Sequence, residues 1–404
     1  MPSDLIPIEK ALDFLLAEVK ENTDVVELPL SEANGCILAG DKQALINVPE
    51  FDNSAMDGYA VNTADLPEPG CLLPVSQTIA AGHPGDSLIK GTAARIFTGA
   101  PIPEGCNAVV IQENTQTVGD SVAIMQLPDV GENIRGKGCD VEKGGVVLSQ
   151  GHRLRPQDLG LLASLGVASV SVKKPITVAI LNTGDEVIAP GTPLLEGQIY
   201  DSNSFTLEAL LKSLGMNVIK LGIVNDTFEE TENSLREAST KADCIITTGG
   251  VSVGDEDHIR YVVEKMGQLA LWKLAIKPGK PFSYGKINGK PLFGLPGNPV
   301  AVFVTFVLLV RPYLLKMQGA SDLFAAAMAL PAGFDIQSPG SRQEYIRVRL
   351  NKSVEGSTVL EAFGNQGSSI MTSLSWADGL AEIPRGETVK KGQLLKFFPF
   401  RGIL

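Results

Sequence analysis

Apolar and polar positions change their spacing several times along this chain, and each change indicates a different kind of structure. Apolar side chains recur at helical spacing among acids over residues 5–20, which predicts an amphipathic helix. From about 50 to 150, short β-branched runs such as AVVIQ and SVAIMQL lie between Gly and Pro clusters, which predicts a β-rich module. A short helix is expected again at 155–167.

The region from about 175 to 318 has a different pattern. Apolar runs such as ITVAIL, DCII and PLFGL alternate there with longer stretches of helical spacing. This alternation predicts βαβ units and a parallel-dominated sheet with helices on both faces. After about 325 the chain returns to short strands and turns, such as EYIRVRLN and QLLKFFPF. The fold class expected is therefore α/β plus β, in a multidomain chain.

Composition argues against several classes of function. Lys and Arg number 34 against 46 Asp and Glu, and the net charge of -12 disfavours non-specific binding to nucleic acid or to an anionic membrane. The five cysteines form no C-x-x-C pair and the histidines number only three, so zinc or iron–sulfur spacing is missing and a reducing cytoplasm is expected.

The acids near the N-terminus argue against a targeting segment. The most apolar window, 300–310, is shorter than the roughly 20 residues that span a bilayer, which favours a buried helix.

Polar residues and glycines follow each apolar run between 175 and 310. Ligands of open α/β sheets bind beyond the carboxyl ends of the strands, so these residues are expected to converge on one rim although they are distant in sequence. The alternative is that Asp and Gly at strand ends form only turns and helix caps. The residues concerned are Asp185, Glu186, Asp226, the loop 247–258, Pro296, Gly297, Asn298 and Pro299.

The loop TTGGVSVGDEDH, residues 247–258, combines glycines with consecutive acids. Its glycine spacing matches neither the dinucleotide fingerprint nor a P-loop, yet a glycine turn still lets the backbone approach an anion. Carboxylates would repel a phosphate unless a hard cation such as Mg²⁺ bridged them, so the acids predict a metal-bridged phosphate, with helix capping by Asp255 and Asp257 as the alternative. The residues expected to bind the anion are Gly249, Gly250, Ser252, Gly254 and Asp255.

Two further stretches are interpreted as anion sites. WKLAIKPGKPFSYGK places several lysines around a proline-stiffened turn, which favours a shaped site over the alternative of solvated surface lysines. In PGNP, Asn298 is expected as the helix N-cap and Pro299 as the first helical residue, which leaves backbone N–H groups for an anion or simply starts a helix. The lysines are Lys273, Lys277, Lys280 and Lys286.

Together with polar loops of the β-rich module, these stretches closely resemble the molybdopterin molybdenumtransferase family, called MoeA in bacteria and present as the E domain of gephyrin and of the plant molybdenum-insertion enzyme. The resemblance covers nearly the whole chain. The stretches that carry it are PEFDNSAMDGYAV, TGAPIPEGCNAVV, GENIRGKGCD, NTGDE, GQIYDSNS, TTGGVSVGDEDH, KLAIKPGKPF and GLPGNP, in family order. DNSAMDGYAV and IKPGKP separate this family from relatives that share only TTGGVSVGD.

The resemblance implies ligation of molybdate to the dithiolene of adenylylated molybdopterin, with release of AMP and dependence on Mg²⁺. It implies a homodimer whose site lies between the α/β domain of one subunit and the β module of the other, with a possible transient contact to the pterin adenylyltransferase. It also implies four domains. These are 1–48 with 141–174 as an N-terminal and linker domain, 49–140 as an inserted β-rich domain, 175–322 as the α/β molybdopterin-binding domain, and 323–404 as a C-terminal β barrel.

By motif match, the resemblance also implies roles for single residues. The chemistry of the residue types adds that Asp226 and Asp257, with Glu186, are expected to hold Mg²⁺. Lys273, Lys277 and Lys280 are expected to contact molybdate or the pterin phosphate. Two other readings stay open: a scaffold that binds molybdopterin or a partner without turnover, and an adenylyltransferase acting one step earlier, which would leave the first 150 residues unexplained. The residues expected to serve catalysis are Asp57, Thr98, Asp140, Glu186, Lys273 and Lys277.

Overall fold

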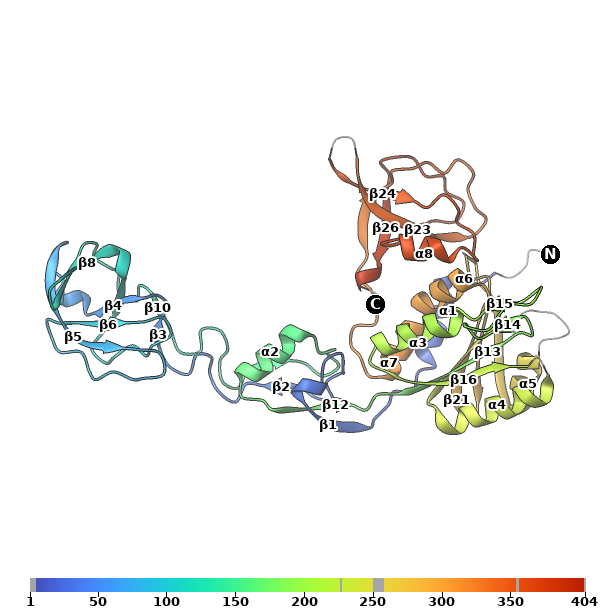
Figure 1. Ribbon diagram of the computed structural model, residues 1–404, viewed down its shortest axis with the longest axis horizontal. Coiled ribbons are helices and arrows are strands. Elements are labelled where there is room, and N and C mark those ends of the chain that lie inside the picture. The colour runs from blue at the N-terminus through green and yellow to red at the C-terminus, as the bar shows by residue number, and fades with distance from the viewer. Residues whose placement is uncertain (1–4, 226, 250–257, 354–355, 403–404) are drawn as a thin grey trace. The chain divides into compact units, whose positions relative to one another are not determined.

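The computed structural model describes residues 5–225, 227–249, 258–353 and 356–402, without the side chains of Leu271 and Trp272. The chain divides into two compact units, and each is described by itself (Figure 1). One unit contains Met1–Ala39, Gly151–Arg155 and Ser171–Leu404, and the other contains Gly40–Gln150 and Pro156–Val170.

The first unit is built on a six-stranded sheet of order β16-β13-β17-β21-β20-β18. The first four strands in this order are parallel, and β20 and β18 are antiparallel additions at one edge, so the parallel-dominated sheet expected from the sequence is confirmed. The strands are β13 (Thr177–Thr183), β16 (Asn217–Val224), β17 (Cys244–Thr248), β18 (Gly267–Lys273), β20 (Pro281–Ile287) and β21 (Lys290–Leu295).

Helices cover both faces of this sheet. In β13, Val178 and Ile180 pack with α1, α3, α6 and α7, whereas Ala179 and Leu181 pack with α4 and α5. Because both faces are buried, the middle of the strand is apolar from Val178 to Leu181 and shows no alternation. The helices are α1 (Ile8–Ala17), α3 (Asn203–Ser213), α4 (Phe228–Lys241), α5 (His258–Met266), α6 (Pro299–Thr305) and α7 (Arg311–Met317), with a π-helical turn at Phe306–Val310 between the last two.

The helical run Pro299–Met317 corrects one argument made from the sequence. The apolar window 300–310 is only part of a longer helical run, because the helix continues to Met317 and reaches 19 residues. Within the described chain it is the one helix long and apolar enough to cross a bilayer, and 83% of it is buried inside the fold. Burial among the other helices, rather than shortness, therefore identifies it as a core helix.

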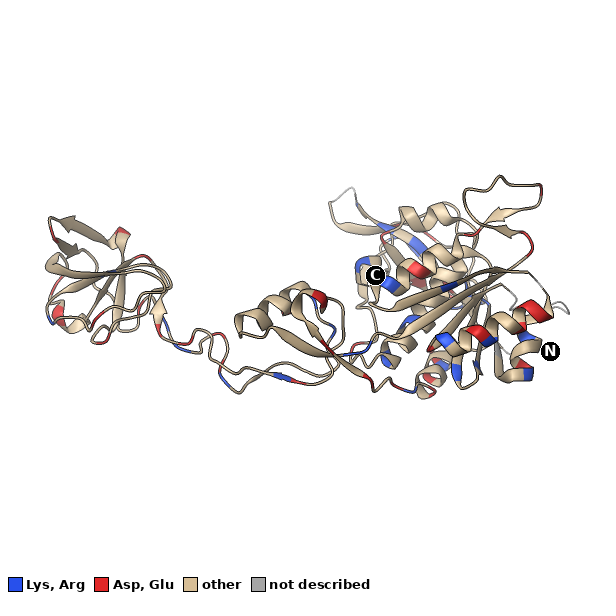
Figure 2. Cartoon of the chain, turned by 60° about the horizontal axis from the view of Figure 1, so that its bottom comes forward, with Lys and Arg blue, Asp and Glu red and all other residues tan. Residues whose placement is uncertain are grey.

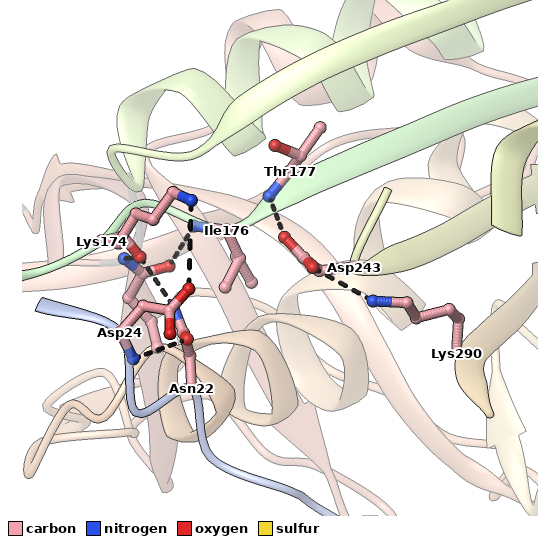
Figure 3. Close-up of polar contacts among 8 residues, drawn as sticks. Asn22, Asp24, Lys174, Ile176, Thr177, Asp243 and Lys290 are labelled. Carbon is pink, nitrogen blue, oxygen red and sulfur yellow. Dashed lines mark hydrogen bonds and ion pairs between the residues drawn. The ribbon is translucent and has the colours of Figure 1, made fainter. Parts of the chain in front are cut away.

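Polar contacts close the sheet at the end where its parallel strands begin (Figure 3). The Asp243 carboxylate accepts the Thr177 backbone N–H at 2.9 Å and lies 3.3 Å from Lys290 Nζ. Asn22 donates through its amide to the Lys174 carbonyl at 2.9 Å. These contacts join the start of β13, the residue before β17 and the start of β21.

The C-terminal part of the first unit is a second sheet of order β19-β23-β25-β26-β22, with β24 paired to β23. Its core contains Val348, Leu360, Ala381 and Phe397. A small β domain is confirmed here, whereas its closure into a barrel stays a prediction. The elements are β19 (Ile276–Lys277), β22 (Met328–Pro331), β23 (Gln343–Lys352), β24 (Thr358–Ala362), α8 (Met371–Trp376), β25 (Gly379–Ile383) and β26 (Leu394–Pro399).

The second unit contains the β-rich module expected from the sequence. Its sheet has the order β7-β4-β6-β5-β9-β8, with cores around Val110 on one side and Val109 on the other. The helix expected at 155–167 is α2 (Pro156–Ser164). The strands are β4 (Gly58–Val61), β5 (Cys71–Ile79), β6 (Ala93–Ile96), β7 (Ala108–Ile111), β8 (Thr115–Val118) and β9 (Ser121–Ile124).

Charged residues of both signs are interspersed over the helices of the first unit (Figure 2). Lys241 pairs with Glu237 at 2.7 Å, and Lys265 pairs with Glu232 at 2.9 Å. Such exposed pairs contribute little to stability, typically about 0–1 kcal/mol each. These helix surfaces are therefore solvated mixed-charge faces and are separate from the site at the carboxyl end of the sheet.

Candidate functional site

A pocket of about 520 Å³ lies where β13, β17 and β21 end. We call it the rim pocket. Residues from the ends of three strands meet here, and Glu186, Gly249, Gly297, Asn298 and Pro299 are the residues singled out from the sequence that line it. Of the other acids expected to converge, Asp185 does not line the pocket, and Asp226, Asp255 and Asp257 lie outside the described residues. The full lining is Asn182, Thr183, Glu186, Val187, Ile199, Tyr200, Asp201, Ser202, Asn203, Thr248, Gly249, Gly297, Asn298, Pro299, Ser369 and Met371.

A chain of buried hydrogen bonds forms the floor of the rim pocket. Thr248 at the end of β17 donates its hydroxyl to Asn182 Oδ1 at 2.7 Å, and Asn182 Nδ2 donates to Asp201 Oδ1 at 2.7 Å. Asp201 also accepts the backbone N–H of Ser204 at 3.0 Å and its hydroxyl, which ties the start of α3 to the two strands. All four side chains are buried, so this network fixes the shape of the floor.

Gly249 makes the exit from β17 possible. Its φ is +83°, and a Cβ there would lie 2.8 Å from the Thr183 carbonyl oxygen. Only glycine combines this left-handed conformation with so close an approach to the neighbouring strand end. The chain after β17 is therefore turned directly at the edge of the rim pocket.

Asn203, the first residue of α3, carries a polar atom without a partner. Its Nδ2 donates to the Gly297 carbonyl at 2.8 Å, which joins α3 to the loop after β21. Its Oδ1 is buried, and no hydrogen-bond donor reaches it from the residues that the structure describes. An unsatisfied buried acceptor costs free energy until a donor reaches it, so its position in a pocket lining indicates a place for a hydrogen-bonding ligand.

The C-terminal domain also contributes to the rim pocket. Ser369 and Met371 belong to the loop and helix that follow β24, and they line the pocket beside Pro299. The carbonyl of Ser368 accepts the backbone N–H of Val300 at 3.0 Å. Asn298 is the N-cap and Pro299 the first residue of α6, as expected, but this contact occupies an N–H group that the sequence analysis left for an anion.

The lysines assigned to an anion do not line the rim pocket. Lys286 Nζ lies 2.6 Å from the carboxylate of Glu18. Lys273, Lys277 and Lys280 are exposed. Lys277 Nζ lies 3.1 Å from the carboxylate of Glu344 on β23. Pro296, the first residue of the stretch PGNP, is buried. The assignment of the lysines to molybdate or phosphate stays a prediction.

The polar loops of the β-rich module meet at one end of the second unit. Asp57 Oδ1 accepts the backbone N–H of Thr98 at 2.7 Å and its hydroxyl at 2.8 Å. The backbone N–H of Thr98, with its hydroxyl, holds the pKa of Asp57 below its usual range. Asp52 accepts the backbone N–H of Lys137 at 2.7 Å, which adds the third loop. Asp140 is exposed, with its N–H bonded to the Val48 carbonyl.

Several predicted residues lie outside the described part of the chain. They include both aspartates expected to hold Mg²⁺ and most of the glycine-rich loop. Among the described residues there is no group of three or more His, Cys, Asp or Glu that could hold a metal ion, and Glu186 is the described member of the expected set. The residues outside are Asp226, Gly250, Ser252, Gly254, Asp255 and Asp257.

Several residues that line the rim pocket were not predicted from the sequence. Asp201, Asn203 and Tyr200 belong to the stretch GQIYDSNS, which was quoted for the resemblance and given no role. The signal available was an Asp-Ser-Asn cluster directly before a helix, which reads as an ordinary cap. Ser369 and Met371 gave no signal, because nothing in their local sequence marks a site.

Models of known families match most of the chain. The MoeA N-terminal region (domain I and II) matches residues 6–166, a probable molybdopterin binding domain matches 179–316, and the MoeA C-terminal region (domain IV) matches 329–400. The rim pocket lies mainly in the second of these, with Ser369 and Met371 from the third.

Relatives match more than nine-tenths of this chain. The molybdopterin molybdenumtransferase of Haemophilus influenzae is 40% identical over 99% of this chain and 100% of that protein, and molybdopterin molybdenumtransferase 2 of Mycobacterium tuberculosis is 36% identical over 92% and 93%. A crystal structure of the molybdopterin biosynthesis moeA protein from Pyrococcus horikoshii is 31% identical, with a TM-score of 0.84 over 98% of this chain and 100% of that chain. The resemblance drawn from the motifs is confirmed, and the chain belongs to the MoeA family of molybdopterin molybdenumtransferases, which are transferases of molybdenum cofactor biosynthesis.

Proposed function

We propose that this protein joins molybdate to the dithiolene of adenylylated molybdopterin and releases AMP in a reaction that depends on Mg²⁺. The observation that carries the proposal is the rim pocket, which lies in the part of the chain that matches a probable molybdopterin binding domain. A volume of about 520 Å³ is within the range of small-ligand sites.

The lining of the rim pocket suits a flat heterocycle rich in N–H groups, such as a pterin. Asn203 Oδ1 lacks a donor among the described residues, and the carboxylate of Glu186 supplies further acceptor oxygens. Val187, Ile199 and Met371 provide apolar walls. A buried acceptor without a partner favours a ligand that supplies a donor over one that does not. We therefore place the pterin ring in this pocket.

The fit for Mg²⁺ rests on the chemistry of the donors. Glu186 supplies a carboxylate to the lining of the rim pocket, and hard cations prefer such oxygen ligands. Glu186 would hold the ion together with Asp226 and Asp257, which lie outside the described residues. The ion would neutralise charge on the phosphate oxygens of the adenylylated pterin. Lys273, Lys277 and Lys280 would orient molybdate or the phosphates by their charge, and Lys277 would exchange Glu344 for the anion.

The β-rich module would complete the site in a homodimer. Asp57, Thr98 and Asp140 would reach the rim pocket of the second subunit. Exposed Phe51 and Phe97 near Asp57 and Thr98 give this end of the module an apolar surface suited to such a contact. The protein would act in the cytoplasm and receive its substrate by a transient contact with the pterin adenylyltransferase.

Single-turnover release of AMP from adenylylated molybdopterin tests the reaction. We expect release only when molybdate and Mg²⁺ are both present. Tight binding of the pterin with no release under any condition would reject molybdenum insertion and favour a scaffold that binds molybdopterin without turnover. Release without molybdate would also contradict the proposed coupling of the two steps.

A mixing experiment tests whether the site is shared. Asp57→Asn and Glu186→Gln each disable a different half of the proposed site. If the halves come from different subunits, mixed dimers contain one intact site, and equal mixing followed by subunit exchange restores roughly a quarter of the wild-type sites. If one subunit supplies both halves, the mixture stays as inactive as either variant alone. Size-exclusion chromatography with light scattering confirms that dimers are present in each sample.

A further inference from the structure

Arg95 of β6 lies beside two aromatic rings at the end of the module that carries Asp57. Its guanidinium carbon lies 5.2 Å from the centre of the Tyr59 ring and 4.7 Å from the centre of the Phe97 ring. Tyr59 and Arg95 are direct partners in the antiparallel register of β4 and β6. Stacking on two rings holds a planar guanidinium in one orientation, which a flexible ammonium would not maintain.

Arg95 donates hydrogen bonds to Gly58 and Gln112, two residues that are attached to Asp57. Nη1 donates to the Gly58 carbonyl at 2.8 Å, and Nη2 donates to Gln112 Oε1 at 3.0 Å. The backbone N–H of Gln112 in turn donates to the Asp57 carbonyl at 3.1 Å. The guanidinium therefore connects the start of β4 with the residue after β7, and Asp57 lies between these two attachments.

The backbone and the carboxylate of Asp57 are also held by contacts that do not involve Arg95. A Cβ on Gly58 would lie 2.0 Å from the Val110 carbonyl oxygen, so β4 already approaches β7 as closely as a glycine allows. Thr98 fixes one carboxylate oxygen of Asp57 through its N–H and its hydroxyl. Arg95 precedes Thr98 on the same chain segment, so it supports both members of the pair.

We propose that Arg95 is a positioning residue for the Asp57–Thr98 pair and that it sets where the Asp57 carboxylate stands in the transfer reaction. This inference rests on the proposed function, in which Asp57 acts on the substrate. Arg95 acts through Asp57 and does not touch the substrate. Its charge has a second effect, since after the Thr98 hydrogen bonds it contributes to lowering the pKa of Asp57. Among the described residues it is the charged group that acts on Asp57, because Thr98 and Gln112 are neutral.

A purely structural role for Arg95 predicts something different. If the stacked guanidinium served only to join β4, β6 and β7, its loss would lower the stability of the module and leave the reaction of the folded protein unchanged. The two roles are separated by a double-substitution cycle, since a residue that acts through Asp57 has no further effect once Asp57 is disabled.

The test uses the full chain and the single-turnover AMP-release assay with Arg95→Met, Arg95→Lys, Asp57→Asn and the double variant Asp57→Asn/Arg95→Met. We expect Arg95→Met to slow release roughly 10- to 100-fold, the range that a small misplacement of a reacting group costs. Arg95→Lys keeps the charge and recovers part of this loss. On the Asp57→Asn background, Arg95→Met adds less than about 2-fold, because the path of its effect is already removed.

The pH profile gives a second readout. Losing the positive charge removes one of the causes that lower the pKa of Asp57, so the carboxylate in Arg95→Met is protonated at higher pH than in the wild type. The acid limb of the rate profile is therefore expected to move to higher pH in Arg95→Met and to stay near its wild-type position in Arg95→Lys.

Three results separate the possible failures. If Arg95→Met releases AMP at the wild-type rate while Asp57→Asn is inactive, Arg95 is not a positioning residue. The same conclusion follows if Arg95→Met lowers the rate by the same factor in the wild type and in Asp57→Asn. If Asp57→Asn releases AMP at the wild-type rate, the proposed role of the module in the reaction is rejected, while the contacts between Arg95 and Asp57 remain as described. If Arg95→Met fails to fold, Gln112→Ala takes its place, because it removes one hydrogen-bond acceptor of Arg95 and keeps the guanidinium charge and both aromatic rings. A partial loss of the AMP-release rate that disappears in Asp57→Asn supports the proposal. An unchanged rate rejects it.

Discussion

Asn182 is the residue on which the floor of the rim pocket depends most directly. It is 3% exposed, and it joins the Thr248 hydroxyl to the Asp201 carboxylate through two hydrogen bonds of 2.7 Å. Asn182→Ala removes both bonds and leaves Thr248 without its acceptor. We expect the variant to lose stability in the first unit and to bind the pterin more weakly, because the start of α3 is no longer tied to β13.

The magnitude follows from the two partners. A hydrogen bond to a charged group contributes about 1.5–3 kcal/mol and a bond between neutral groups about 0.5–1.5 kcal/mol. Their sum gives an expected loss of about 2–4.5 kcal/mol for Asn182→Ala. Asp201 keeps both of its bonds from Ser204, which favours the lower half of that range. Thr248→Val removes only the neutral bond and is expected to cost about 1 kcal/mol.

Equilibrium unfolding in urea, followed by circular dichroism, measures these losses. The transitions of the two units have to be resolved, because multidomain proteins do not unfold in one step. Hydrogen exchange of the β13 amides gives the local value independently. Binding of molybdopterin, followed by its fluorescence, shows whether the floor matters for the ligand.

The comparison with Thr248→Val decides whether the reasoning is correct. If Asn182→Ala costs no more than Thr248→Val, the bond to Asp201 carries no charge-assisted strength and the buried network is not what shapes the floor. The same conclusion follows if Asn182→Ala lowers stability as expected and binds the pterin with unchanged affinity. The double variant is expected to cost less than the sum of the single ones, because they share one bond.

Four further outcomes follow from the described contacts and from the sequence. Gly58→Ala places a Cβ 2.0 Å from the Val110 carbonyl oxygen, so limited proteolysis is expected to find the β-rich module unfolded and the first unit intact. Glu186→Gln is expected to abolish AMP release in the single-turnover assay while pterin binding stays within about 3-fold, because the pocket keeps its shape and loses one charge. Asp243→Ala removes a hydrogen bond to a charged group at the opposite end of the sheet, so it is expected to cost about 1.5–3 kcal/mol in urea unfolding and leave the rate of AMP release unchanged. Asp257→Ala is expected to lower turnover far more than stability, and a variant that unfolds while its folded fraction keeps full specific activity would show that this acid is only a helix cap.

The arrangement of the strands followed from the sequence because of a simple constraint. Parallel strands joined by helices have all their carboxyl ends at one edge, so Glu186, Gly249 and Asn298 had to converge once the βαβ pattern was recognised. The faces of β13 could not be assigned in the same way. Val178 and Ala179 are equally buried on opposite sides of the sheet. Because apolar and polar residues do not alternate there, the sequence does not indicate which helix covers which face.

The floor of the pocket was harder to predict for a physical reason. Asn182 and Asp201 are polar residues whose function depends on being buried, and burial is a property of the folded chain. In sequence, Asn182 reads as a residue at a strand exit and Asp201 as a residue before a helix, and both readings are locally correct. Their bond to each other spans 19 positions, and no local rule joins them.

The start of α6 shows how a distant segment changes what a local motif can do. Asn298 and Pro299 begin the helix as the sequence predicts, and a helix start alone suggests donors for an anion. Pro299 has no N–H, however, and the N–H of Val300 is bonded to the Ser368 carbonyl from the C-terminal domain. Part of the expected anion site is thus used to attach the loop that brings Ser369 and Met371 to the pocket. The C-terminal domain is therefore a wall of the rim pocket as well as a separate fold, and recognition of an anion there has to depend on side chains more than on the helix start.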